Sequence, residues 1–112
     1  MSVRTFTQEW SGVWPGGHSV AAGFIRFPVS HLSEEFGIAF KPGADDLGSF
    51  VEAALRLRSG RAILLVQRTH PTAPIEIYVD ANDRPSEAVR ELETALGLVG
   101  RQVVQRISPG SD

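Results

Sequence analysis

The fold is decided by residues 45–107, which read DDLGSFVEAALRLRSGRAILLVQRTHPTAPIEIYVDANDRPSEAVRELETALGLVGRQVVQRI. The unbroken apolar run at 62–66 has the length of a strand, and such a run is typical of a central strand covered on both faces. Apolar and polar residues alternate over 75–80, which predicts a second strand with one face less buried. The short, Pro-containing linker between the two predicts a β-hairpin.

Helices are predicted on both sides of this hairpin. The first spans 45–59, because two aspartates are suited to cap its N-terminus and apolar residues follow at helical spacing from Leu47 onward. The second begins at Pro85, since a missing N–H costs nothing in the first turn, and ends at Gly97. Alternating residues at 103–107 predict a final strand.

The N-terminal part of the chain has a weaker pattern. An alternating stretch at 3–7 and an apolar stretch at 20–27 predict two strands, and residues 37–40 predict a further short one. A single helical turn is expected to start near Ser30. The Pro-Gly pair within 41–44 predicts a turn.

These elements together predict an α+β fold, a two-layer sandwich with two helices on one face of a mainly antiparallel sheet. If residues 37–40 join the same sheet, the order becomes β-α-β-β-α-β, which is a ferredoxin-like core with an N-terminal β extension. We expect a single α+β domain over 1–112. Within it, residues 1–20 form an extension with a Trp/Gly-rich loop, and residues 108–112 form a flexible tail.

The composition argues against several classes of function. The chain has 112 residues, a formal net charge of −2 and no cysteine, so it offers no disulfide, thiolate nucleophile or cysteine zinc site. An acidic chain whose one lysine is Lys41 has no general electrostatic reason to bind nucleic acid or anionic lipid. No apolar run approaches the roughly 20 residues of a membrane-spanning helix, and residues 1–10 lack the apolar core of a secretory signal. We therefore expect a cytoplasmic protein.

Histidine and glutamate residues form the first candidate site. His31, Glu34 and Glu35 share one face if they lie on a helical turn. If folding brings His70 or His18 close to them, the set suits a metal site or an acid–base pair, and with His70 it could line a ligand pocket. The spacing is not that of a zinc protease motif, and one histidine with two carboxylates is common on solvated surfaces. We therefore predict no metal and no cofactor.

A tryptophan- and glycine-rich segment forms the second candidate site. Trp10 and Trp14 flank a loop that runs on to His18. The loop lacks the lysine and the following helix of a phosphate-binding loop. Exposed tryptophan is favoured at protein interfaces, whereas a tryptophan packed on the domain edge has a structural role. The partner-binding hypothesis assigns Trp10, Trp14 and His18 to such an interface.

Two charged clusters have simpler interpretations. Asp80 and Asp83 follow a predicted strand, but the residues after them do not continue a calcium loop, so a turn and helix cap are favoured. Arg56, Arg58 and Arg61 surround the end of the first predicted helix, where cations complement the helix dipole. A solvated face is favoured there over an anion site.

Two functions remain open. The first is a small cytoplasmic, non-catalytic binding or regulatory module that acts through protein–protein contacts, as a homodimer or with another protein. Its contact would be a sheet edge or the tryptophan loop, and it is favoured because no motif for chemistry is found in the sequence. The alternative is a small enzyme or ligand-binding domain. Its pocket would use His31, Glu34, Glu35 and His70.

Overall fold

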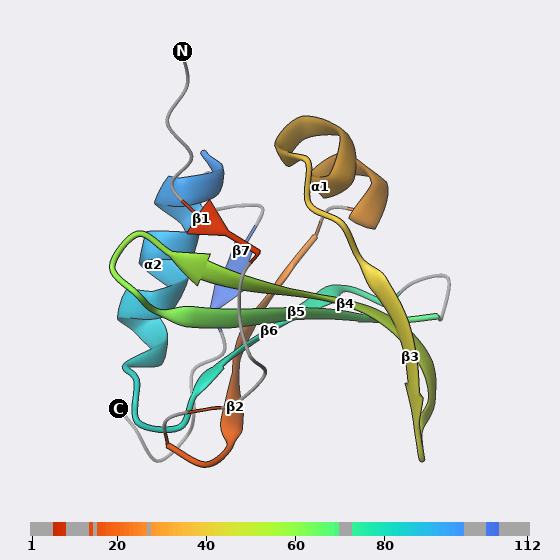
Figure 1. Ribbon diagram of the computed structural model, residues 1–112, viewed down its shortest axis with the longest axis horizontal. Coiled ribbons are helices and arrows are strands. Elements are labelled where there is room, and N and C mark those ends of the chain that lie inside the picture. Colours follow the sequence, from red (N-terminus) through yellow and green to blue (C-terminus); the bar gives the residue numbers. More distant parts are fainter. Residues whose placement is uncertain are drawn as a thin grey trace.

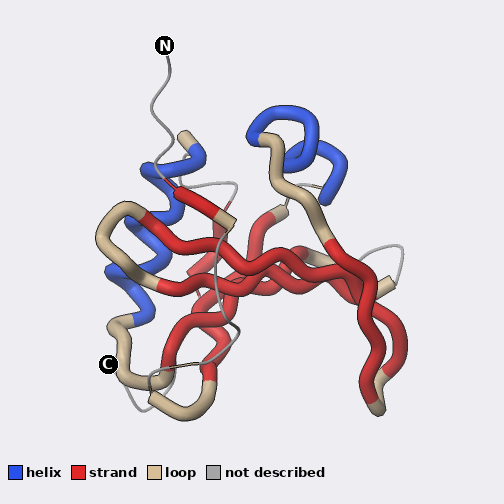
Figure 2. The backbone as a smooth tube through the Cα atoms, in the orientation of Figure 1, coloured by secondary structure: helices blue, strands red, loops and turns tan. Residues whose placement is uncertain are grey.

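The structure is a computed structural model, and it describes residues 6–8, 14, 16–26, 28–69, 73–97 and 103–105, the last three by their backbone only. Within these residues the chain forms a seven-stranded sheet and two helices (Figures 1 and 2). The elements in chain order are β1 (Phe6–Thr7), β2 (Ser19–Ile25), α1 (Val29–Phe36), β3 (Lys41–Asp45), β4 (Gly48–Leu57), β5 (Ala62–Arg68), β6 (Ile75–Asp80), α2 (Pro85–Leu96) and β7 (Val103–Gln105). The predicted α+β class is confirmed.

The sheet is antiparallel at every strand pair of the described residues. Its order is β1-β4-β5-β6-β2-β7, and β3 also pairs with β4. The predicted β5–β6 hairpin is confirmed, with Leu65 opposite Ile77. Since β6 and β7 both run antiparallel to the intervening β2, they are parallel to each other, and α2 connects them. This is a split β-α-β unit.

The helix predicted over 45–59 is wrong, because this segment lies in a β-hairpin formed by β3 and β4. The apolar residues of β4 also fit a period of two, and Ala53, Leu55 and Leu57 are buried at alternate positions. Residues 50–56 of β4 pair with β5, and this pairing selects the strand because tertiary contacts override helix propensity. Asp45 consequently caps no helix; its Oδ1 accepts the backbone N–H of Leu47 at 2.9 Å in the hairpin turn.

Two predictions for the residues before this hairpin are also wrong. Residues 37–40 form no strand, and the turn expected at 41–44 belongs to β3. The β-α-β-β-α-β order therefore does not appear, and the strand order does not show a ferredoxin-like core. The turn expected near Ser30 is a full helix, α1, which ends at Gly37 with a left-handed φ of 68°.

Both helices contribute to one hydrophobic core with the same face of the sheet, which we call the inner face. Leu32 of α1 and Leu92 of α2 are fully buried in this cluster. The second helix follows its prediction, with Pro85 in the first turn and Gly97 as a left-handed C-cap. The strand residues of the inner face alternate along the chain and include Leu55, Leu57, Ile63, Leu65, Ile75, Ile77 and Val79.

The other side chains of the central strands form the outer face. The register places Ala54 opposite Leu64 and Leu64 opposite Tyr78, so these three make a row across β4, β5 and β6. All three are half-buried. Every buried helical side chain of the described residues belongs to the inner-face core instead. Ala54, Leu64 and Tyr78 therefore form an apolar row on the outer face, and Glu52, buried Val66 and Glu76 form the row beside it.

The β3–β4 hairpin projects from the body of the sheet, away from both helices (Figure 1). We call residues 41–50 the arm. Most of its residues are exposed. In the described part of the chain, neither helix has the length and apolar character needed to cross a bilayer.

Candidate functional site

Helix α1 carries three of the residues predicted for a ligand pocket, but it does not assemble them into one. The His31 ring is half-buried and meets the Phe36 ring edge-on, with centroids 6.4 Å apart. Glu34 and Glu35 are exposed. Among the described residues no cluster of three potential metal ligands occurs. His70 lies outside the described residues, so the four-residue pocket stays a prediction.

The tryptophan loop is docked against the sheet where the structure describes it. Trp14 is half-buried, and its carbonyl accepts the backbone N–H of Gly17 at 2.9 Å. The carbonyl of exposed His18 accepts the N–H of Ala81 at 2.9 Å, just after β6. Trp10 lies outside the described residues. The predicted partner-binding loop is therefore a docked connection at Trp14 and His18, and their role toward a partner stays a prediction.

Asp80 at the end of β6 anchors this loop. Its side chain is nearly buried, with 8% of the residue exposed. One carboxylate oxygen accepts the N–H of Gly16 at 2.8 Å, and the other accepts the N–H of Asn82 at 2.7 Å. A Cβ at position 16 would overlap the Asp80 carboxylate and lie 3.0 Å from Asn82 Cγ. Glycine is therefore required at position 16 by close packing.

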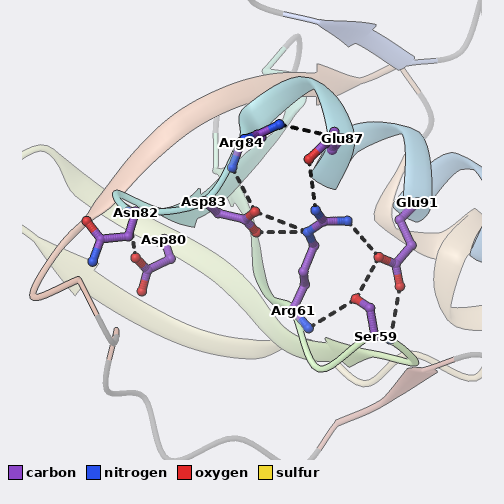
Figure 3. A network of polar contacts seen from close by, with 8 residues as sticks. All are labelled: Ser59, Arg61, Asp80, Asn82, Asp83, Arg84, Glu87 and Glu91. Carbon is purple, nitrogen blue, oxygen red and sulfur yellow. Dashed lines mark hydrogen bonds and ion pairs between the residues drawn. The ribbon is translucent and has the colours of Figure 1, made fainter.

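Arg61 binds three carboxylates at the junction of the β4–β5 turn and α2 (Figure 3). Its guanidinium lies 3.1 Å from Asp83, 2.9 Å from Glu91 and 3.3 Å from Glu87. The Ser59 hydroxyl donates to Glu91 at 2.6 Å, and the Ser59 N–H donates to the same carboxylate at 3.2 Å. Arg61 thus belongs to a polar network, which corrects the prediction of a solvated arginine.

The charges in this network shift each other's titration. Burial raises the pKa of the Glu91 carboxyl, but the hydrogen bonds from Ser59 and the contact with Arg61 together hold that pKa below its usual range. Burial lowers the pKa of Arg61, and its carboxylate partners more than restore it. Both partners are therefore stabilised in their charged forms, which suits a structural clamp better than a proton-transfer site.

A depression of about 360 Å³ lies beside this network, at neighbouring ends of β4, β5 and β6. The guanidinium of Arg61 and the carboxylate of Asp80 border it, but both are engaged as described. Arg56 is exposed and donates one N–H to the Gly60 carbonyl at 3.0 Å, so its other donors remain for a ligand. The lining residues are Arg56, Ser59, Gly60, Arg61, Ala62, Asp80, Asn82 and Asp83. The depression offers a cation beside apolar surface. The Ser59 hydroxyl also lines it and donates to Glu91, but the lowered pKa of Glu91 makes this carboxylate a weak base.

The arm is braced on the outer face. Arg68 of β5 makes two hydrogen bonds to Asp45, at 2.6 and 2.8 Å, and its guanidinium lies 5.2 Å from the centre of the Phe50 ring. The Phe50 ring lies against Gly43, where an added Cβ would come within 2.6 Å of it. The hydrogen bonds from Arg68 lower the pKa of the Asp45 carboxyl.

The tip of the braced arm presents a leucine to solvent. Leu47 is 82% exposed, and it is the one exposed large hydrophobic residue in the described part of the chain. The predicted helix placed Leu47 on a buried stripe, which is wrong. Leu47 is exposed because it lies in the turn between β3 and β4. The local sequence does not reveal this turn, since the same residues also fit a helix.

Comparison with known proteins adds no assignment. No family model, no curated protein and no solved structure matches this chain. The geometry of the arm and of the depression is therefore the basis for assigning a function.

Proposed function

We propose that this chain is a small cytoplasmic, non-catalytic binding module that acts through protein–protein contacts and uses the arm as its contact element. The observation that carries the proposal is Leu47, 82% exposed at the tip of a projecting hairpin. Burying a leucine side chain stabilises by about 1.5–3 kcal/mol. The free protein does not obtain this stabilisation from Leu47, whereas a complex that covers the residue does. Isolated exposed apolar residues are common; the bracing of the arm distinguishes this one.

The bracing also favours recognition over flexibility. Asp45, Phe50 and Arg68 hold the arm through an ion pair and a cation–π contact. A preorganised element loses little conformational entropy on binding, so more of the contact energy appears as affinity.

The charged groups of the described residues support a structural rather than a catalytic use. Arg61, Glu91 and Asp80 each hold two segments of the chain together. A catalytic site would instead place a nucleophile within reach of a base with a pKa near the working pH.

The test is affinity capture from a cell extract with three forms of the protein. Leu47→Asp puts a charge at the contact, while Leu47→Met keeps an apolar side chain of similar volume and serves as the matched control. We expect the wild type and Leu47→Met to retain the same protein, and Leu47→Asp to lose it at an unchanged melting temperature. If Leu47→Asp retains the same proteins as the wild type, the arm is not the contact element and the proposal fails.

A further inference from the structure

We propose that the depression beside the Arg61 network binds a free amino acid, whose carboxylate pairs with Arg56 and whose ammonium group pairs with Asp80. This site is separate from the arm, so the proposal goes beyond the binding function assigned to Leu47. It follows from two charged side chains that line the depression and form no ion pair with any described residue.

Asp80 supplies the negative charge of the site. The residue is nearly buried, and a carboxylate in such a position is normally paired with a cation. Its oxygens are instead engaged by the backbone N–H groups of Gly16 and Asn82, which carry no net charge. Each oxygen has a further lone pair beyond these bonds. The part of Asp80 that lines the depression is therefore available to the cationic group of a ligand.

Arg56 supplies the positive charge. It is exposed, and its guanidinium donates one N–H to the Gly60 carbonyl at 3.0 Å. A guanidinium presents its donors as a planar fork, so a carboxylate can accept two of the remaining N–H groups side by side. Arg61 also lines the depression, but three carboxylates already share its charge. Arg56 is thus the cation that a ligand can engage.

The two charges lie on either side of a small residue. Arg56 of β4 pairs with Ala62 of β5, and the next position of the β5–β6 register places Ala62 beside Asp80. With one strand between them, the Cα atoms of Arg56 and Asp80 are roughly 10 Å apart. The methyl group of Ala62 leaves room between the two longer side chains. The depression, at about 360 Å³, falls within the range of small-molecule sites, about 300–1,000 Å³.

This pair of charges favours a zwitterion over a simple ion. A bare anion at Arg56 would lie near the Asp80 carboxylate, and a bare cation at Asp80 would lie near the Arg56 guanidinium, so each would meet a like charge. An amino acid offers the opposite charge to both groups. The exposed Asn82 also lines the depression, and its side-chain oxygen is suited to accept a second N–H of the ammonium group.

Titrations followed by the backbone amide NMR spectrum of the full chain test the proposal. The probes are alanine, leucine and γ-aminobutyrate, which differ in apolar volume and in the distance between their charges. We expect saturable shifts at the amides of Ala62, Asp80 and Asn82 with one or more of these probes. The N-acetyl derivative of that probe lacks the ammonium charge, and its methyl ester lacks the carboxylate. Each should bind about tenfold weaker or less, because it loses one charge-assisted contact.

Matched variants connect the titration to the assigned cation. Arg56→Gln should weaken binding of the same probe about tenfold or more. Arg58→Gln is the control, because Arg58 is exposed on the same turn but does not line the depression. The two probe derivatives test both charges on the unaltered protein, so the outcome does not depend on the folding of a variant. Leu47→Asp should bind the probe as the wild type does, which separates this site from the arm.

Three results would overturn the proposal. The first is the absence of saturable shifts with all of the probes. The second is a derivative that binds as tightly as its parent amino acid, since the depression would then recognise a single charge. The third is equal binding by Arg56→Gln and Arg58→Gln.

Discussion

Replacing Arg61 with methionine removes the cation that three carboxylates share while it keeps most of the apolar stem. The Arg61 side chain is 26% exposed, and those of Asp83 and Glu91 are 17% and 24% exposed, so these two contacts are largely shielded from solvent. Glu87 is 48% exposed and contributes little. Hydrogen bonds between charged groups contribute about 1.5–3 kcal/mol, and partial exposure places the expected loss for the variant near 2 kcal/mol. For a chain of this size that lowers Tm by about 9 °C.

The loss should depend on pH in a defined direction. The pKa of Glu91 in the folded protein lies below its ordinary value of 4.5, because the Ser59 and Arg61 contacts outweigh burial. A carboxyl with a lowered pKa stabilises the fold when ionised, so its contribution is present above the unfolded pKa and is lost as pH falls through the folded pKa. Arg61→Met removes the arginine's share of this contribution. The difference between wild type and variant should therefore be full near neutrality and shrink below about pH 4.5.

The assay is urea unfolding of both proteins at about pH 7 and about pH 3.5. Arg58→Met is the matched control, since Arg58 is exposed on the same turn. We expect the control to lie within about 0.5 kcal/mol of the wild type. An Arg61→Met variant that also lies within that range, or one whose deficit does not shrink in acid, would refute the role assigned to the network.

Two further pairs of substitutions test the fold and the docked loop. Leu55→Ala should lower the free energy of unfolding by about 2–5 kcal/mol, because Leu55 is fully buried on the inner face. Leu47→Ala should change it by less than about 0.5 kcal/mol. Equal losses in urea unfolding would contradict the hairpin register. Gly16→Ala and Asp80→Ala should each lower the free energy of unfolding by about 1–3 kcal/mol. The loss in the double variant should be clearly smaller than the sum of the two single losses. Additive losses would show that Gly16 and Asp80 do not act as one contact.

The elements that the sequence predicts well are those with local signals. The length of the apolar run in β5 and the alternation in β6 indicate strands, and the linker between them is short. Pro85 and Gly97 mark both ends of α2. In each case the residues that specify the element lie inside it or next to it.

The β3–β4 hairpin could not be predicted in the same way. The stretch FVEAALRL satisfies a helical and a strand period, and two aspartates before it suit a helix cap as well as a hairpin turn. Pairing with β5, as between Ala54 and Leu64, selects the strand. Leu47 moves from a buried stripe to an exposed tip as a consequence.

The polar contacts also could not be predicted from the sequence, because they join residues that are far apart in the chain. Asp80 binds the backbone of Gly16 across 64 positions of the chain, and Arg61 reaches Asp83 across 22 and Glu91 across 30. No local spacing encodes such pairs. The sequence does identify Asp80, Asp83 and Arg61 as members of charged clusters, but their partners follow only from the sheet order.

The most direct measurement is to identify what the arm tip touches. A photo-crosslinking amino acid at position 47 samples the tip, and the same amino acid at position 90, on the exposed side of α2, is the control. We predict discrete protein adducts from position 47 and none from position 90. Equal labelling from the two positions, or no adduct from position 47, would contradict a binding function of the arm.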